Sequence, residues 1–180
     1  NVWGTTETTS EGYQIAGNWV GVLFAVQSIG SILWAMVLPM FRKIKVGYSV
    51  SLVLGAIGFI STFFIHDQYL LFISFILIGC GWAAMLAMPF AMLTNSLSGN
   101  SMGAYLGLFN CTICLPQIIA SLVGGTLFGL FGGEMVDVAT ATGEVVQVQS
   151  GQIMMLVIAG VALVLGALAV FGISTKKQEA

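Results

Sequence analysis

Charge is the scarcest property of this sequence. Only 7% of its 180 residues are Asp, Glu, Lys or Arg, and the sequence contains one histidine, His66. A soluble globule covers much of its surface with charged side chains, and a chain that is 58% hydrophobic, with a mean hydropathy of +1.01, has too few of them to do so. The sequence therefore predicts an integral membrane protein.

The same scarcity excludes several kinds of site. The sequence has no basic patch for nucleic acid, no metal-ligand cluster, no acid/base pair and no phosphate-cradling loop. Cys80, Cys111 and Cys114 all lie in apolar segments, where we interpret them as small packed side chains and not as disulfide partners or metal ligands. We therefore expect no enzyme, no metal site and no nucleic-acid partner.

Five uncharged, mainly apolar runs are each long enough to cross a hydrocarbon core, which takes about 20 residues. They predict membrane-spanning helices at residues 18–41, 46–65, 69–93, 102–131 and 153–173. We expect an all-α polytopic bundle over residues 18–175, between an external loop at 1–17 and a tail at 176–180. The connection before the last helix alternates apolar and polar residues, which fits either a small β-hairpin or an irregular loop.

Basic residues orient these helices. Arg42, Lys43 and Lys45 follow the first predicted helix, while Lys176 and Lys177 follow the fifth, so four crossings place both groups on one side. The positive-inside rule makes that side cytoplasmic. We expect a multi-pass protein of the plasma membrane, the inner membrane in a bacterium, which starts outside and ends inside. An odd helix count with an external start predicts that at least one helix precedes this segment.

Amide and indole side chains are concentrated in the first, third and fourth predicted helices, which predicts a peripheral position for the second and fifth. An amide without a partner costs several kcal/mol in hydrocarbon, so these side chains face either other helices, as hydrogen-bonding bridges, or a polar cavity. Stacking on a sugar ring and membrane-interface anchoring are the alternatives for the tryptophans, and Trp3 and Trp19 fit the interface better. The candidate substrate-binding residues are Gln27, Trp34, Trp82, Asn110 and Gln117.

Two prolines lie within predicted helices. Pro89 and Pro116 each free a backbone carbonyl and bend a helix at mid-membrane depth, either as a hinge beside a cavity or as a simple packing kink. Small residues four positions apart, as at Ser51 and Gly55, predict close helix contacts, and the pairs Gly17 with Gly21 and Gly103 with Gly107 repeat this spacing. No charged residue or histidine lies inside the five predicted helices, so an energising residue must lie elsewhere.

Three segments carry a family resemblance: Met88-Pro89-Phe90-Ala91, then Leu106-Gly107-Leu108-Phe109-Asn110 followed by Pro116-Gln117, and also Gly17-Asn18-Trp19-Val20-Gly21. They resemble the sucrose and maltose transporters of the glycoside-pentoside-hexuronide symporter group, within the major facilitator superfamily. The likeness covers most of the chain.

This resemblance implies a twelve-helix parent, of which the chain is helices eight to twelve in the C-terminal half, with a missing N-terminal half as its partner. It implies import of a disaccharide such as maltose or sucrose by alternating access, with a proton as coupling ion and no other cofactor. An exporter of another small solute, a membrane enzyme and a non-transporting sensor on the same scaffold are the alternatives.

Overall fold

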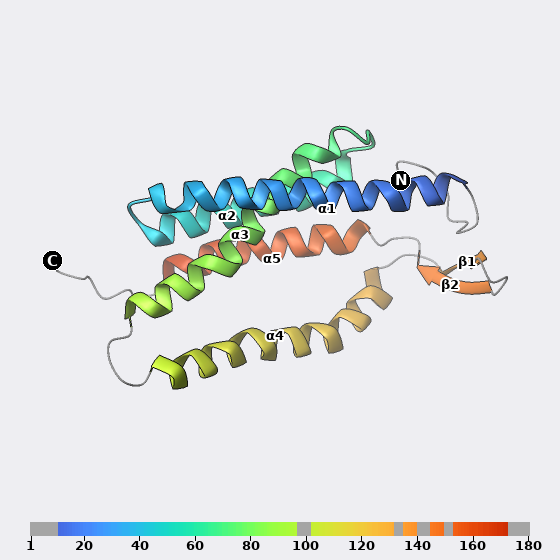
Figure 1. The fold of residues 1–180 in the computed structure, drawn as a ribbon. Coiled ribbons are helices and arrows are strands. Elements are labelled where there is room, and N and C mark those ends of the chain that lie inside the picture. The colour runs from blue at the N-terminus through green and yellow to red at the C-terminus, as the bar shows by residue number, and fades with distance from the viewer. Residues whose placement is uncertain (1–10, 97–101, 132–134, 140–144, 150–152, 173–180) are drawn as a thin grey trace.

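The structure, a computed structural model, describes residues 11–96, 102–131, 135–139, 145–149 and 153–172. Five long helices make up most of it: α1 (Glu11–Val37), α2 (Ile44–Phe64), α3 (Leu71–Ser96), α4 (Met102–Phe131) and α5 (Ile153–Gly172). A short 3-10 helix, η1 (Leu38–Met40), follows α1, and two strands, β1 (Met135–Ala139) and β2 (Val145–Gln149), precede α5 (Figure 1). The predicted all-α helical bundle is confirmed.

The connection before α5 forms the small hairpin that its alternating pattern allowed. β1 and β2 pair in antiparallel fashion, with Met135 opposite Gln149 and Ala139 opposite Val145. The strands are short and stand outside the helical bundle, so they do not change the fold class (Figure 1).

Three predicted helix boundaries are wrong by three residues or more. α1 ends at Val37, where η1 follows, and not at residue 41. α1 begins at Glu11, so residues 11–17, which were expected in an external loop, are helical. The apolar run marks only the part of a helix that lies in hydrocarbon, and a helix can continue beyond it. α3 continues to Ser96 because the Thr94 hydroxyl donates to the carbonyl oxygens of Phe90 at 3.0 Å and Ala91 at 3.2 Å instead of ending the helix. The remaining predicted loop and tail residues, 1–10, 97–101 and 176–180, lie outside the described residues.

All five helices are long and apolar enough to cross a membrane, with candidate spans of 20 to 27 residues. Large apolar side chains are exposed along them, including Met36 at 72% and Leu122 at 73%. Water disfavours such a surface, whereas acyl chains accommodate it. These are the features of a multi-pass membrane protein.

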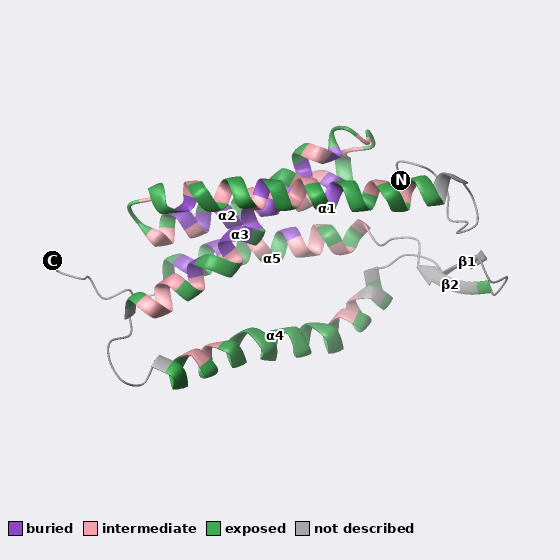
Figure 2. Ribbon diagram, viewed as in Figure 1, coloured by how far each residue is buried: buried purple, intermediate pink, exposed green. Residues whose placement is uncertain are grey.

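Four of the helices pack side by side in the order α1, α3, α2, α5. The predicted peripheral position of α2 is therefore wrong, since α2 contacts both α3 and α5 and 44% of its span is buried. α4 lies apart from this group, and none of its span is buried among the described residues (Figures 1 and 2). Small residues explain the position of α2, because they allow backbones to approach.

The contact between α2 and α3 depends on glycine. A Cβ atom added to Gly58 would lie 2.7 Å from the carbonyl oxygen of Ser74 and 2.8 Å from the amide nitrogen of Ile78. The close contact predicted at Ser51 and Gly55 is confirmed, since a Cβ on Gly55 would lie 3.1 Å from the Cα of Gly81. The contacts predicted at Gly17, Gly21, Gly103 and Gly107 are wrong within the described structure, where a Cβ at any of them would meet nothing within 4 Å.

Serine hydroxyl groups join neighbouring helices. The Ser31 hydroxyl donates to the carbonyl oxygen of Gly79 at 2.9 Å, which links α1 to α3. The buried Ser49 hydroxyl donates to the carbonyl oxygen of Ala167 at 3.1 Å, which links α2 to α5. The Ser61 and Ser74 hydroxyl oxygens lie 2.8 Å apart between α2 and α3. Each helix crossing in the row thus combines close packing with a polar link.

Replacing Ser74, which is 1% exposed, with alanine should lower the free energy of unfolding modestly. Hydrogen bonds between membrane helices contribute about 0.6 kcal/mol on average and about 1.7 at most. Ser121→Ala is the matched control, because the Ser121 hydroxyl is exposed on α4 and donates at 3.0 Å to Gln117 of its own helix. Denaturation of the micellar protein with increasing dodecyl sulfate measures both variants. Equal losses in the two would contradict a bridging role for Ser74.

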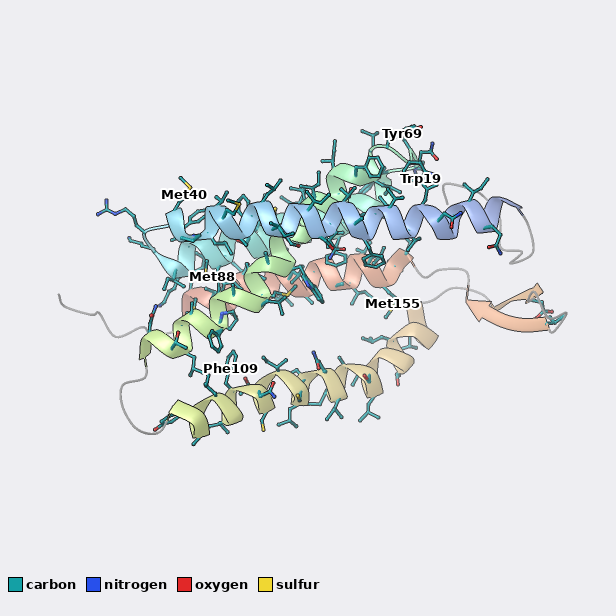
Figure 3. The ribbon with its side chains drawn as sticks, in the orientation of Figure 1. Trp19, Met40, Tyr69, Met88, Phe109 and Met155 are labelled. Carbon is teal, nitrogen blue, oxygen red and sulfur yellow. The ribbon has the colours of Figure 1, made fainter. Side chains whose placement is uncertain are left out.

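The two ends of the bundle differ in chemistry. At the end that holds the start of α1, the Trp19 ring lies 5.7 Å from that of Tyr69 and 5.4 Å from that of Phe72. Met40 lies at the opposite end, where the basic connection to α2 begins (Figure 3). Aromatic clusters of this kind are typical of a membrane–water boundary, and a position at that boundary stays a prediction for Trp19. Trp3 lies outside the described residues.

Candidate functional site

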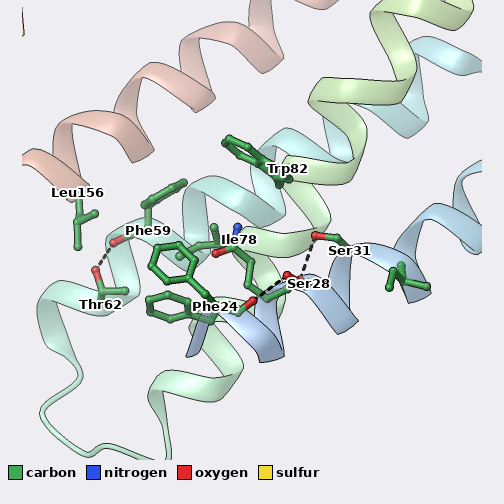
Figure 4. A pocket seen from close by; sticks show the side chains of 11 residues that line it. Phe24, Ser28, Ser31, Phe59, Thr62, Ile78, Trp82 and Leu156 are labelled. Atoms are coloured by element: carbon green, nitrogen blue, oxygen red, sulfur yellow. Dashed lines mark hydrogen bonds between the residues drawn. The ribbon is translucent and has the colours of Figure 1, made fainter. Parts of the chain in front are cut away.

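A cavity of about 500 Å³ lies among α1, α2 and α3, with Leu156 of α5 on one side (Figure 4). This volume is within the range of small-molecule sites, roughly 300 to 1,000 Å³. Its aromatic lining is Phe24, Phe59, Phe75 and Trp82, and its polar lining is Gln27, Ser28, Ser31 and Thr62. The cavity therefore combines ring faces with a few polar groups.

Helical spacing brings these side chains to one place. On α1, Phe24, Gln27, Ser28 and Ser31 are three or four residues apart and share one face. On α3, Phe75, Ile78 and Trp82 repeat that spacing on the facing surface. The Phe24 and Phe75 rings meet edge to face across the two helices, with centroids 6.1 Å apart. Two amphipathic faces thus form the walls.

The hydroxyl groups of the lining are already engaged as donors. Ser28 donates to the carbonyl oxygen of Phe24 at 2.9 Å, and Thr62 donates to that of Phe59 at 2.6 Å. Ser31 donates to the carbonyl oxygens of Gln27 at 3.0 Å and Gly79. Toward a ligand these oxygens therefore offer lone pairs and act as acceptors.

Gln27 and Trp82 are the predicted site residues that the structure brings together. Gln27 is half-buried and Trp82 is 51% exposed, and both line the cavity. Their side-chain N–H groups have no hydrogen-bond partner among the described residues, so they are the donors available to a ligand. The cavity thus offers several acceptors, two donor groups and aromatic faces.

Trp34, a third predicted site residue, is not in this cavity lining. Its indole N–H donates to the Ser51 hydroxyl oxygen at 2.8 Å, and Ser51 in turn donates to the carbonyl oxygen of Gly47 at 2.7 Å. The Trp34 ring also packs against the buried cluster of Leu38, Ala84 and Met88. Its contacts link α1 to α2 and α3, which is a structural role.

The two predicted residues of α4 lie apart from Gln27 and Trp82. Asn110 lines a second cavity of about 500 Å³, between α3 and α4, beside Phe90 and Phe109. The rings of these two phenylalanines lie 6.4 Å apart, and Figure 3 shows Phe109 on the side of α4 that faces α3. Gln117 is exposed, and no described residue contacts its side-chain amide through a hydrogen bond. The five candidates therefore do not form a single site in this arrangement.

Both predicted kink positions lie inside continuous helices. Pro89 is within α3 and Pro116 within α4. Neither can donate to the carbonyl four residues earlier, so acceptors at Met85 and Thr112 are released. A role as hinge or kink stays a prediction for both residues.

Several cavity residues were not among the sequence candidates. Phe24, Ser28 and Phe75 share helix faces with Gln27 or Trp82, and this spacing could have identified them. Phe59 and Thr62 come from α2, whose central position the polar content of the sequence did not indicate. The α1 and α3 walls were therefore predictable from helical spacing, whereas the α2 wall was not.

The cysteines differ in their surroundings. Cys80 is buried in α3, as the interpretation of packed side chains expects, whereas Cys111 and Cys114 are exposed on α4. All three are free thiols. In the described part of the chain, no group of three or more His, Cys, Asp or Glu side chains is placed to hold a metal ion.

The lining of the cavity, with its acceptors, two donor groups and aromatic rings, suits a small polar ligand that has apolar faces. No family model matches the chain, and no solved structure matches it.

Proposed function

We propose that this chain is part of a secondary transporter, a proton-coupled symporter that imports a disaccharide such as maltose or sucrose by alternating access. The observation that carries the proposal is the meeting of Gln27 and Trp82 in one cavity of about 500 Å³. The resemblance of the segments around Pro89 and Pro116 to the glycoside-pentoside-hexuronide symporters of the major facilitator superfamily supports the same function.

The chemistry of the cavity matches that of a sugar. A pyranose ring has an apolar face of C–H groups, which stacks on an indole such as Trp82. Its hydroxyl groups donate to the oxygens of Ser28, Thr62 and Gln27 and accept from the Gln27 amide. A ligand with many hydroxyl groups therefore uses both the acceptors and the donors.

The proposed transporter spans a plasma membrane and includes an N-terminal half beyond this chain. The Arg42 and Lys43 end faces the cytoplasm of a plasma-membrane protein, in accord with the positive-inside rule. The exposed face of α4, with Asn110 and Gln117, borders the path once the N-terminal half packs against it. The proton-coupling group lies in that half, since the described helices hold no charged residue near mid-span.

Uptake of labelled maltose and sucrose into vesicles tests this function, using the complete transporter with and without an imposed proton gradient. Gln27→Leu should weaken apparent sugar affinity by about 1 to 3 kcal/mol, because ligand hydroxyl groups lose their partner in a desolvated site. Asn18→Leu is the matched control, an exposed amide on the same helix outside the cavity. Uptake that does not depend on the proton gradient, or equal apparent sugar affinity in the Gln27→Leu and Asn18→Leu variants, would overturn the proposal.

The aromatic lining favours one other candidate, an exporter of an apolar solute. Phe24, Phe59 and Phe75 supply more ring surface than one sugar stacking contact needs. Growth of cells that express the complete protein, exposed to apolar toxic compounds, separates the two functions. Resistance without sugar uptake would favour export.

A further inference from the structure

Positive charge is gathered at one end of the described structure. Arg42 and Lys43 are exposed in the connection between η1 and α2, and Lys45 follows in the first turn of α2. The acidic residues that the structure describes belong to the opposite end of the helices or to the hairpin: Glu11, Asp67 and Asp137. Among the described residues, no carboxylate therefore belongs to the end that holds Arg42 and Lys43.

The start of α2 adds to the positive potential. Lys43 is the N-cap residue and makes no side-chain capping hydrogen bond. Its carbonyl oxygen accepts from the N–H groups of Val46 at 3.0 Å and Gly47 at 3.1 Å. The N–H groups that precede Val46 are therefore those that an α-helix leaves without intrahelical partners, at the positive end of its dipole.

Exposed apolar side chains lie directly beside these cations. Met36 is 72% exposed and Met40 is 77% exposed at the end of α1 and in η1. Val46 and Val50 are each 39% exposed at the start of α2. Both pairs lie in candidate membrane spans, Gln14–Met40 and Ile44–Phe64, at the ends that adjoin the basic connection. The end of a span is where acyl chains meet the headgroups.

We propose that this end of the protein binds an anionic phospholipid. The phosphate contacts the Arg42 guanidinium, which can donate two parallel hydrogen bonds, and the Lys43 ammonium group. An acyl chain lies along Met36 and Met40. Inorganic phosphate can pair only with the cations, and a neutral lipid can cover only the apolar surface. An anionic phospholipid does both, because it carries a phosphate and acyl chains in one molecule. This inference does not depend on the transported solute.

Delipidated protein in mixed micelles tests the proposal, with bound lipid counted by native mass spectrometry. Dioleoylphosphatidylglycerol is the anionic probe and dioleoylphosphatidylcholine the neutral one. The double variant Arg42→Gln, Lys43→Gln should bind the anionic lipid about 10-fold more weakly or worse, since each basic side chain contributes substantially at an anionic surface. Raising the salt from about 50 to about 500 mM should weaken the binding by screening.

Two further variants make the outcome decisive. Arg42→Lys, Lys43→Arg preserves the charge and should keep the preference for phosphatidylglycerol. Lys176→Gln, Lys177→Gln removes two charges of the same predicted face that are not part of the proposed contact, so it should change the preference little. Equal affinity for the two lipids, an equal loss in the Lys176 and Lys177 variant, or displacement of the bound lipid by millimolar inorganic phosphate would each overturn the proposal.

Discussion

Replacing Gly58 with valine should prevent α2 and α3 from packing and leave most of the protein aggregated. A Cβ atom there would lie 2.7 Å and 2.8 Å from backbone atoms of Ser74 and Ile78, which cannot move aside as a side chain can. Inserting extra methyl groups into a packed interior costs about 1 to 3 kcal/mol and occasionally more. We expect the loss of stability at Gly58 to reach the upper end of this range or exceed it, because α2 and α3 must move apart to accommodate the valine side chain.

Gly107→Val is the matched control for this experiment. It introduces the same residue into a membrane helix, and a Cβ at Gly107 meets nothing within 4 Å. The monodisperse fraction on size-exclusion chromatography and the midpoint of thermal unfolding measure both variants. Gly107→Val should behave as the parent does. Equal recovery of the two variants would contradict the close α2–α3 crossing.

Alanine substitutions at Trp34 and Trp82 should have opposite consequences. Trp34→Ala removes an indole that packs on buried Ala84 and Met88 and donates to Ser51, so we expect a loss of stability of about 3 to 5 kcal/mol. Trp82 is 51% exposed, so Trp82→Ala should leave the folded fraction nearly unchanged. If the proposed function holds, Trp82→Ala instead reduces sugar uptake by the complete transporter.

Phenylalanine variants separate ring packing from hydrogen bonding at the same two positions. Trp34→Phe keeps much of the packing and should cost only the bond to Ser51, about 0.5 to 1.5 kcal/mol. Trp82→Phe keeps a ring for stacking and should retain part of the uptake. Unfolding by Trp82→Ala, or a stable Trp34→Ala protein that fails to transport, would reverse the two assigned roles.

Hydropathy predicted the helices well because bilayer thickness fixes the length of each apolar run. Hydropathy did not indicate the order in which the helices pack, since the side chains that face lipid are as apolar as those that face protein. Ser49, Gly55 and Gly58 determine that α2 is central, through close contacts that polar content does not reveal. The isolated position of α4 could not be read from Asn110 or Gln117 either.

The candidate site was partly predictable for a similar reason. Gln27 stands out in an apolar helix, and its spacing from Ser31 marks a face that the cavity uses. Trp34 is on the same helix and looked equivalent, but its partner Ser51 belongs to another helix, and the pairing exists only after folding. Phe59 is apolar, like most of its helix, so nothing in the sequence marked it as a residue of the cavity lining.

The bridging serines have a consequence for the order of assembly. Ser31 donates to Gln27 in its own helix at 3.0 Å as well as to Gly79, and Ser61 donates to Gly58 at 2.8 Å as well as meeting Ser74. α1 and α2 precede α3 in the chain, so they are synthesised first and exist for a time without it as a docked partner. During that interval each hydroxyl has an acceptor within its own helix, so the helix can enter the bilayer without an unsatisfied donor. Later docking of α3 then adds a second partner to groups that were never exposed to hydrocarbon alone.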